Sequence, residues 1–452
     1  MSADLFEVEI ESLDQEGRGV AHRDGKAVFV EGALPGERVA YERRRNKPSY
    51  EVGRVVRIDR ESVLRVEPRC PHAGLHVGAC GGCSMQHVET RAQVAIKQRV
   101  LEDTLWHIGR LRPRTVLRAI AGPAWGYRHR ARFAVRYVAR KGAVLVGFHE
   151  RASSYVADIR QCEVVPRHVS DLLLPLRGLV GSLSLRERLP QIELAIAEHA
   201  GKTQTVLVFR VLADPTANDR SLLAEFGRRH AVDVWLQPGG PGSAAPLEQD
   251  AIGRLEMELP EFGVRLPFGP TDFTQVNHRI NEVLVARAVR LLAPADGESV
   301  VDFFCGLGNF TLPLATRAAR VVGIEGNPAL VDRAQLAAAE NGLAERTVFI
   351  AANLFDWTVD DWRRLVESHG PIHKALIDPP REGALAVARA LAATSDRPDR
   401  LVYVSCNPAT LARDCAVLVH EGEWTLRAVG VVNMFPHTSH VESIAMLEPT
   451  AP

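Results

Sequence analysis

The pattern of apolar and polar positions changes twice along the chain. Residues 5–58 contain short stretches in which apolar and polar residues alternate with period two, separated by turns that contain glycine. Many short strands at this spacing are typical of a small β-barrel. From about residue 270 onwards, continuous apolar stretches alternate with helical patterns, which indicates a parallel, doubly wound α/β sheet. Its strands are predicted at 299–304, 320–325, 347–350, 374–378 and 401–405.

The region between these two parts has mixed α/β character. A loop rich in cysteine, glycine and histidine covers residues 66–90, and a helix is predicted after it, with Gly109 as its stop. The apolar stripe of this helix consists of Val94, Leu101, Leu105 and Ile108. Further strands are predicted at 127–137, 191–196 and 204–211. At roughly 150 residues per domain, the chain is expected to divide into three domains, over 1–66, 67–268 and 269–452.

Composition restricts the class of protein without identifying it. Of the 452 residues, 46% are apolar and 24% are charged, which excludes a disordered, collagen-like or disulfide-rich chain. No apolar run approaches the roughly 18 residues of a transmembrane helix, so we expect no membrane partner. The acidic N-terminus does not resemble a signal peptide, and we expect a cytoplasmic protein. Seven cysteines, an odd number, favour metal binding, catalysis or burial over a disulfide framework.

The formal net charge is zero, yet cations are concentrated in two segments. Residues 38–60 carry a local excess of cations, which a solvated hairpin tip would also show. Residues 110–141 hold nine arginines and one lysine and no acidic residue. Four of these arginines alternate with other residues along the predicted strand and fall on one face: Arg128, Arg130, Arg132 and Arg136. Such a face favours binding to nucleic-acid phosphates; the alternative is pairing with acids from elsewhere in the chain.

Four cysteines form a candidate metal site. Cys70, Cys80 and Cys83 lie in the glycine-rich loop, and Cys162 lies far downstream. Four thiolates suit a tetrahedral zinc ion or an iron–sulfur cluster, and the spacing does not distinguish the two. A role without metal is the remaining alternative.

A glycine-containing turn follows the first predicted strand of the doubly wound sheet. Gly306 and Gly308 allow a ligand to approach the backbone closely, and Glu325, at the end of the next strand, can bind the two hydroxyls of a ribose. A dinucleotide site would carry a third glycine where this chain has Thr311. The motif therefore favours S-adenosylmethionine (SAM) over NAD, with a purely structural turn as the alternative.

Three further residues lie where ligands bind in an open α/β sheet, at the carboxyl ends of strands. Asp378 begins an Asp-Pro-Pro-Arg loop after the fourth predicted strand. Cys406 follows the fifth in a Ser-Cys-Asn-Pro segment, so we interpret it as a nucleophile, whereas Cys305 and Cys415 are interpreted as buried thiols. Glu442, near two histidines, is a candidate base, and the spacing of these histidines is unlike that of a helical zinc site.

Together these residues resemble the RNA uracil-5-methyltransferase family, and in particular its branch that modifies 23S ribosomal RNA. The resemblance covers nearly the whole chain. It implies a multidomain protein: an N-terminal TRAM domain, which is a small OB-like RNA-binding barrel, a central α/β iron–sulfur domain, and a C-terminal SAM-dependent methyltransferase domain. It also implies that the helix near 91–118 packs with the catalytic domain although it interrupts the central one.

The functional residues of the family fall on matching positions of this chain. The [4Fe–4S] cluster would be bound by Cys70, Cys80, Cys83 and Cys162. Nine residues separate Cys70 from Cys80, more than is usual in the family, and His76 in this longer loop is an alternative ligand. The SAM contacts would be Gln275, Phe304, Asn309, Glu325, Asn353 and Asp378.

The activity implied is methylation of C5 of a uridine. The Cys406 thiolate attacks C6 of the base, C5 then takes the methyl group of SAM, Glu442 removes the C5 proton, and the thiolate leaves. The target base must first leave its stack. We expect a monomer that binds 23S ribosomal RNA, with Arg128, Arg130 and Arg132 among its RNA contacts.

Two alternatives stay open at this point. The substrate could be a uridine of transfer RNA or another ribosomal uridine. The chain could also be a catalytically inactive RNA-binding protein that uses the barrel and the arginine strand. The presence of Cys406, Glu442 and the turn at Gly306 favours an enzyme.

Overall fold

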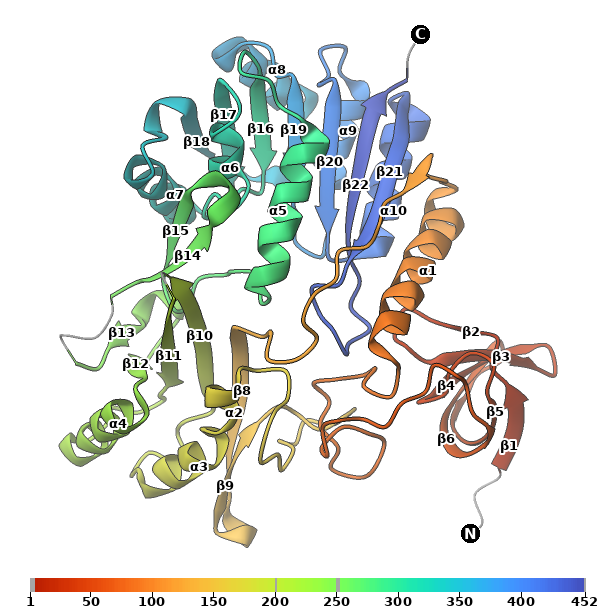
Figure 1. The fold of residues 1–452 in the computed structure, drawn as a ribbon, viewed down its shortest axis with the longest axis vertical. Coiled ribbons are helices and arrows are strands. Elements are labelled where there is room, and N and C mark those ends of the chain that lie inside the picture. Colours follow the sequence, from red (N-terminus) through yellow and green to blue (C-terminus); the bar gives the residue numbers. More distant parts are fainter. Residues whose placement is uncertain (1–4, 200, 249–252, 451–452) are drawn as a thin grey trace.

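The computed structural model of the protein describes residues 5–199, 201–248 and 253–450. Its strands form three six- to eight-stranded sheets and a two-stranded ribbon (Figure 1). In the view of Figure 1, the N-terminal sheet lies at the lower right, the central sheet at the lower left, and the C-terminal sheet above both. Within the described residues, no helix is both long enough and apolar enough to cross a bilayer.

The N-terminal sheet has six strands in the order β1-β5-β6-β4-β3-β2. Val28 and Val30 are fully buried while their neighbours in β4 are half-exposed, as expected where one sheet face covers a core. The strands are β1 (Leu5–Glu9), β2 (Ser12–Leu13), β3 (Gly19–Arg23), β4 (Lys26–Glu31), β5 (Arg38–Asn46) and β6 (Tyr50–Arg60).

The central sheet has the order β13-β12-β11-β10-β8-β9. One of its faces packs against α3 and α4, and part of the other face packs against the ribbon β14–β15, which belongs to the same core as the C-terminal sheet. The strands of the sheet are β8 (Arg130–Val138), β9 (Ala143–Gly147), β10 (Gln191–His199), β11 (Lys202–Arg210), β12 (Asp233–Gln237) and β13 (Ala245–Pro246). The ribbon consists of β14 (Leu255–Leu259) and β15 (Val264–Phe268). The helices are α2 (Arg167–Ser170), α3 (Leu173–Ser182) and α4 (Ala217–His230).

The C-terminal sheet is the doubly wound sheet that the apolar strands predicted. Its order is β18-β17-β16-β19-β20-β22-β21-β7, with the first five strands parallel and β22 antiparallel to β20. The strands are β16 (Ser299–Phe303), β17 (Arg320–Glu325), β18 (Thr347–Ala351), β19 (Lys374–Ile377), β20 (Arg400–Ser405), β21 (Trp424–Val432), β22 (Glu442–Pro449) and the edge strand β7 (Thr115–Val116).

Helices cover both faces of this sheet, which explains why its strands are apolar throughout. One face packs against α5 (His278–Leu292), α6 (Thr311–Ala315) and α7 (Pro328–Glu340). The other packs against α8 (Val359–His369), α9 (Leu385–Ala393), α10 (Pro408–Glu421) and α1 (Thr90–Gly109).

Helix α1 joins the C-terminal sheet although it lies early in the chain. It ends at Gly109 as predicted, and its side chains share a core with those of α10. The predicted stripe is wrong at Ile108, which is 52% exposed. The buried stripe instead continues towards the N-terminus through two polar residues, Gln93 and Lys97, at the same four-residue spacing as Leu101 and Leu105.

Candidate active site and cysteine pocket

One cavity of about 730 Å³ lies at the carboxyl ends of the parallel strands, a volume within the range of small-molecule sites. It is lined by all eight residues predicted from the sequence to bind SAM or to act in catalysis. These are Gln275, Phe304, Asn309, Glu325, Asn353, Asp378, Cys406 and Glu442. They come from seven separate segments of the chain, so the fold alone brings them together.

The turn after β16 has the backbone of a ligand-binding loop. Phe304 has a φ of 63°, which is uncommon for a bulky residue, and Gly308 has a φ of 91°, which L side chains rarely adopt. The N–H of Gly306 donates to one oxygen of Glu325 at 3.1 Å, and the N–H of Asn327 donates to the other at 3.0 Å. Both oxygens are thus fixed at the end of β17, facing the cavity, where a ribose can reach them.

Hydrogen bonds to neighbouring residues hold the two asparagines of the site. Asn309 exchanges two hydrogen bonds with the Asn281 amide of α5, at 2.8 and 3.0 Å. The side chain of Asn353 accepts the N–H of Phe355 at 3.1 Å. The ring of Phe355 meets that of Phe304 edge-on, with centroids 5.7 Å apart. The two rings give this end of the cavity an aromatic wall suited to a flat base such as adenine.

Cys406 and Glu442 lie at adjacent ends of neighbouring strands. The register of β20 and β22 ends with Ser405 paired with Ser443; Cys406 directly follows β20, and Glu442 is the first residue of β22. Cys406 directly precedes Asn407, which caps α10 by accepting the N–H of Ala409 at 3.1 Å. A thiolate is stabilised at such a helix N-terminus.

The Asp-Pro-Pro-Arg loop is attached to the same helix end. Asn407 donates to the carbonyl of Arg381 at 3.1 Å, and Arg413 donates to that of Glu382 at 2.8 Å. The Arg381 guanidinium lines the cavity, 3.4 Å from Nδ1 of His440. The loop therefore places a cation beside the acidic groups of the site.

Burial controls the protonation of Cys406, Glu442 and Asp378. The pKa of Cys406 is raised to about 11, mainly by burial and also by the charges of Glu442 and Asp378, while the charge of Arg381 acts to lower it. Burial also raises the pKa of Glu442 to about 8, with Asp378 adding to the effect, and that of Asp378 to about 7. Glu442 therefore exchanges its proton near neutral pH, as a general base must.

A buried lysine fixes the segment that leads to Glu442. Lys97 of α1 is 1% exposed, and its Nζ donates to Oδ1 of Asn433 and to the carbonyl of Phe435, both at 2.8 Å. In the described part of the chain it makes no ion pair with a carboxylate. Burial lowers the pKa of Lys97 to about 7. Lys97 thus holds the backbone of Phe435, which itself lines the cavity.

The same segment is also bonded to the cysteine-rich loop. The N–H of Met85 donates to the carbonyl of His437 at 2.9 Å, and the N–H of Ser439 donates to Oγ of Ser84 at 2.9 Å. Gln93 accepts the N–H of His437 at 2.8 Å. The segment of the candidate base is therefore held from two sides, by α1 and by the loop that carries three of the four cysteines.

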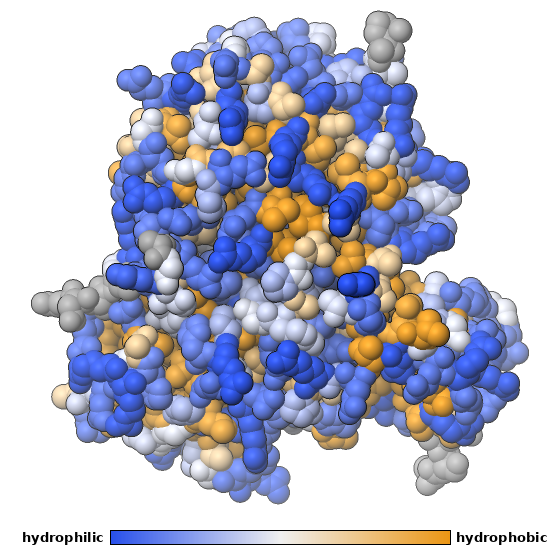
Figure 2. Space-filling view, in the orientation of Figure 1, coloured by the Kyte–Doolittle hydropathy of each residue, from blue (hydrophilic) through white to orange (hydrophobic). Residues whose placement is uncertain are grey.

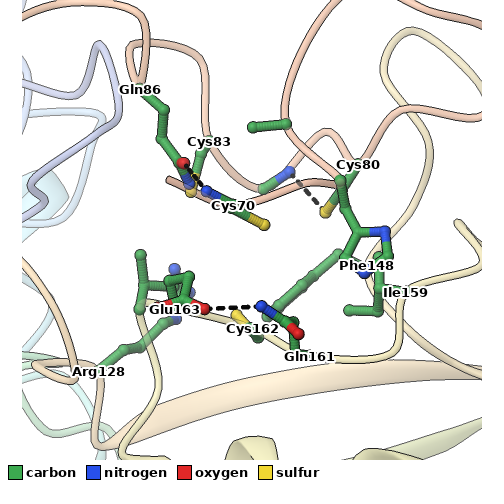
Figure 3. A pocket seen from close by; sticks show the side chains of 14 residues that line it. Cys70, Cys80, Cys83, Gln86, Arg128, Phe148, Ile159, Gln161, Cys162 and Glu163 are labelled. Atoms are coloured by element: carbon green, nitrogen blue, oxygen red, sulfur yellow. Dashed lines mark hydrogen bonds between the residues drawn. The ribbon is translucent and has the colours of Figure 1, made fainter. Parts of the chain in front are cut away.

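The four candidate metal ligands line a second pocket, in which their sulfur atoms face a common space (Figure 3). Burial raises the pKa of Cys80 to about 11 and that of Cys83 to about 12, and it also raises the pKa values of Cys70 and Cys162. For Cys80, Cys83 and Cys162 the other thiols of the set add to the effect, and for Cys70 the charge of Glu163 does. Four such thiols can ionise together only if a cation compensates their charge.

The histidines near this pocket do not complete a single-ion site. His76, the alternative ligand, is exposed and does not line the pocket. His72 lines it, but its Nε2 accepts the N–H of Arg160 at 3.0 Å. Across the described residues, no group of three or more His, Cys, Asp or Glu side chains is arranged to hold one metal ion.

The three arginines predicted to bind RNA have different environments. Strand β8 begins at Arg130, and the alternation of buried and more exposed positions along it is as predicted. Arg128 lines the cysteine pocket, and Arg130 donates to the carbonyls of Pro270 and Asp272. Arg132 is 69% exposed and lies 3.3 Å from Glu193. Of the three, only Arg132 lies open to a large partner.

Several residues of the site carry no motif in the sequence. Lys97 and Gln93 were not predicted, although their four-residue spacing with Leu101 and Leu105 was a usable signal. Arg381 and His440 were seen only as neighbours of Asp378 and Glu442, and the structure adds both to the cavity wall.

The chain is similar to known proteins both in sequence and in fold. Residues 91–450 match the sequence family described as tRNA (Uracil-5-)-methyltransferase, and residues 4–40 match the TRAM domain. The chain belongs to the tRNA (uracil-5-)-methyltransferase family. This membership identifies the doubly wound C-terminal part as a SAM-dependent methyltransferase fold and the N-terminal sheet as a TRAM domain.

Members of this family with curated names cover almost the whole chain. A protein of Bordetella avium named 23S rRNA (uracil(1939)-C(5))-methyltransferase RlmD is 57% identical, over 98% of this chain and 91% of its own length. A protein of the same name from Burkholderia pseudomallei is 58% identical, over 98% and 94%. A solved structure, tRNA (uracil-54, C5)-methyltransferase of Pyrococcus abyssi in complex with S-adenosyl-L-homocysteine, shares the fold with a TM-score of 0.72. It is 21% identical over 98% of this chain and 100% of that chain.

Proposed function

We propose that this chain is a SAM-dependent methyltransferase that forms 5-methyluridine in 23S ribosomal RNA. The observation that carries this proposal is the placement of Cys406 and Glu442, at adjacent ends of β20 and β22, in the wall of a cavity that also holds the turn at Gly306. The names of the relatives specify uracil 1939, and their identity of 57–58% over nearly the full chain supports the same target here. Acting on ribosomal RNA, the enzyme would work in the cytoplasm, and we propose a monomer.

The thiol of Cys406 performs the first step. Its sulfur forms a bond to C6 of the uracil, and the displaced electron pair makes C5 nucleophilic. Before this step the thiol must lose its proton, which passes by way of the Glu442 carboxylate to solvent; the helix N-terminus at Asn407 and the nearby Arg381 stabilise the thiolate. When bound, SAM supplies an electrophilic methyl group for C5.

Glu442 completes the reaction. As a carboxylate it removes the proton from C5, the electron pair re-forms the C5–C6 double bond, and the bond between sulfur and C6 breaks. Its raised pKa, about 8, makes it a stronger base than an exposed glutamate. Hydrogen bonds from α1 and from the cysteine loop fix the segment that leads to this carboxylate.

For the second pocket we propose a [4Fe–4S] cluster bound by Cys70, Cys80, Cys83 and Cys162. Its four donors are all thiols, which suits iron–sulfur chemistry. The four side chains come from two separate segments of the chain and face one space, which supports the cluster. The cluster would cross-link the cysteine loop to the segment around Cys162.

The domain arrangement belongs to the same proposal. We propose an RNA-binding TRAM domain over 1–66, a central iron–sulfur domain over 67–268 with α1 packed on the catalytic part, and a catalytic domain over 269–452. The hydrogen bonds from Lys97 and the pairing of β7 with β21 support this assignment of α1. Among the predicted RNA contacts, the exposure of Arg132 supports a phosphate contact there.

A labelling experiment tests the function. Purified enzyme is incubated with methyl-labelled SAM and total RNA from cells that lack the enzyme, and the RNA species are separated. We expect label in 23S RNA as 5-methyluridine, and none with Cys406→Ala. Label in transfer RNA only, or no label with the unmutated enzyme, would overturn the proposal.

A further inference from the structure

A second cationic surface lies far from the cavity, at the C-terminal end of α1. The Trp106 side chain is 39% exposed there. The guanidinium carbons of Arg110 and Arg112 lie 5.5 and 4.6 Å from its ring centroid. Arg114, which directly precedes β7, is also exposed. We call these four residues the Trp106 surface.

The arginines of the Trp106 surface have no acidic partners. From residue 104 to residue 149 the sequence contains no Asp or Glu. Among the ion pairs of the described residues, none involves Arg110, Arg112 or Arg114. Unpaired like charges held this close repel one another. The arrangement therefore favours an anionic partner that lies outside this chain.

The cations continue along the chain towards the cavity. After β7, the exposed Arg118 lies near Arg287 of α5. Burial and the charges of Arg290 and Arg118 lower the pKa of Arg287. Figure 2 shows strongly hydrophilic side chains standing on an apolar area between α5 and α1. The N-terminal end of α5 lies close to the cavity, since Asn281 bonds to Asn309.

Topology places the Trp106 surface at the opposite end of the sheet from the cavity. Strand β7 runs parallel to β21, and both run in the direction of β20, because β22 is antiparallel to β20 and to β21. The cavity lies at the carboxyl end of β20, whereas the Trp106 surface precedes the amino end of β7. Through β21 and β22 the register aligns Thr115 with Val402, four residues before Cys406, so at about 3.3 Å per residue the cavity lies roughly 13 Å beyond Thr115 along the strands.

We propose that the Trp106 surface is a second RNA-binding surface, which holds the phosphate backbone of the substrate while an unpaired base stacks on Trp106. Arginines without acidic partners match phosphates, and an exposed indole close to two guanidiniums offers a stacking platform. This proposal rests on the proposed function, since it assumes an RNA substrate long enough to reach from the cavity to the end of the sheet.

Binding to a 23S RNA fragment tests the proposal. The triple variant R110S/R112S/R114S should raise the KM for the fragment about tenfold or more. It should also lower the slope of log affinity against log salt by about 2, because each lost phosphate contact removes roughly 0.7 to 0.9. The Kd for SAM and the kcat at saturating RNA should not change. The variant R110K/R112K/R114K should keep the slope, and Trp106→Ala should weaken binding with the slope unchanged.

A matched control removes arginines that do have partners. In R229S/R363S/R364S the lost residues are ion-paired with Glu225, Asp360 and Asp361, so the salt slope should stay at its original value. An unchanged slope in R110S/R112S/R114S, with methylation intact, would overturn this inference and leave the proposed function standing. A binding defect seen only when ribosomal proteins are present would mean that the surface binds a protein, and would also overturn the inference. If the unmutated enzyme methylates no RNA, the proposed function fails instead.

Discussion

The catalytic cavity and the cysteine pocket bury ionisable groups in different combinations. In the cavity, one thiol, Cys406, lies among the carboxyl groups of Glu442 and Asp378, with Arg381 beside them. In the cysteine pocket, four thiols face one another. Burial is the largest cause of the raised pKa in both places. What differs is which group can take the proton of a thiol.

This difference separates two kinds of chemistry. A thiol near a carboxyl group with a pKa of about 8 can exchange protons near neutral pH, which is what covalent catalysis requires. Four thiols whose pKa values are all raised by burial lose their protons together only when a metal compensates the charge. Cys406 should therefore affect turnover, and a cysteine of the second pocket should affect metal content and stability.

The largest effect is expected at Cys406. Cys406→Ala removes the sulfur that activates the ring, so methylation should fall by a factor on the order of 10⁴ or more. Cys305→Ala is the matched control, because Cys305 is a buried thiol in the wall of the same cavity. Single-turnover methylation of a 23S RNA fragment measures both. Retained activity in Cys406→Ala would remove the distinction between the two pockets.

Cys83→Ser should act on metal and stability. Enzyme purified without oxygen should contain about four irons and labile sulfide per chain when unmutated. The variant should lose most of the iron and melt at a lower temperature, while the Kd for SAM stays within about twofold. Cys415→Ser should retain the iron, because Cys415 lies outside the pocket. One equivalent of zinc in the unmutated protein would contradict the cluster.

Lys97→Met tests the support of the candidate base. Loss of the two hydrogen bonds should let the Phe435 segment shift, and a displacement of about 1 Å can cost about 100-fold in rate. We expect kcat to fall 10- to 100-fold with the KM for SAM unchanged. The free energy of unfolding should change by only about 1 kcal/mol, since burying the lysine is itself unfavourable.

Lys374→Met provides the comparison for Lys97. Lys374, the first residue of β19, is also largely buried, but it forms an ion pair with Glu298 and lies away from the cavity. Its replacement should leave kcat unchanged. Equal losses of kcat in both variants would mean that Lys97 acts through general stability.

The smallest effect is on stability as a function of pH. The pKa of Glu442 is raised by burial to about 8 in the folded protein, so between its unfolded value near 4.5 and about 8 the folded state binds more protons. Stability should therefore fall as pH rises through this window. Glu442→Gln should remove part of this decrease in the free energy of unfolding. The variant should be more stable than the unmutated protein at pH 9 but not at pH 4, and urea unfolding at the two pH values measures this. A parallel shift at both values would contradict the raised pKa.

The sequence predicted the doubly wound sheet well because its physical signal is local. Five continuous apolar strands with helices between them allow few other arrangements, and β16 to β20 lie within a residue or two of their predicted positions. The cavity residues followed because the carboxyl ends of parallel strands meet at one edge. Strand β8 was predicted three residues too long at its start, since Tyr127 to His129 continue its alternation without pairing in the sheet.

The contacts across the chain could not be predicted in this way. Lys97 and Asn433 are separated by 336 residues, and nothing in either segment marks the other as its partner. Periodicity placed Arg128 and Arg130 on a predicted RNA-binding face. It could not show that Arg130 bonds to the carbonyl of Pro270, because that contact forms only when the central sheet packs against the chain leading to α5.

The central claim is that Cys406 adds to the base and that Glu442 ends the covalent state. The most direct measurement is a denaturing gel of enzyme, SAM and labelled 23S RNA fragment, followed by mass analysis of the bound peptide. Glu442→Gln should accumulate a methylated protein–RNA adduct attached at Cys406, and RNA with 5-fluorouridine should trap the unmutated enzyme in the same way. An adduct at another residue, or full turnover by Glu442→Gln without an adduct, would contradict the account.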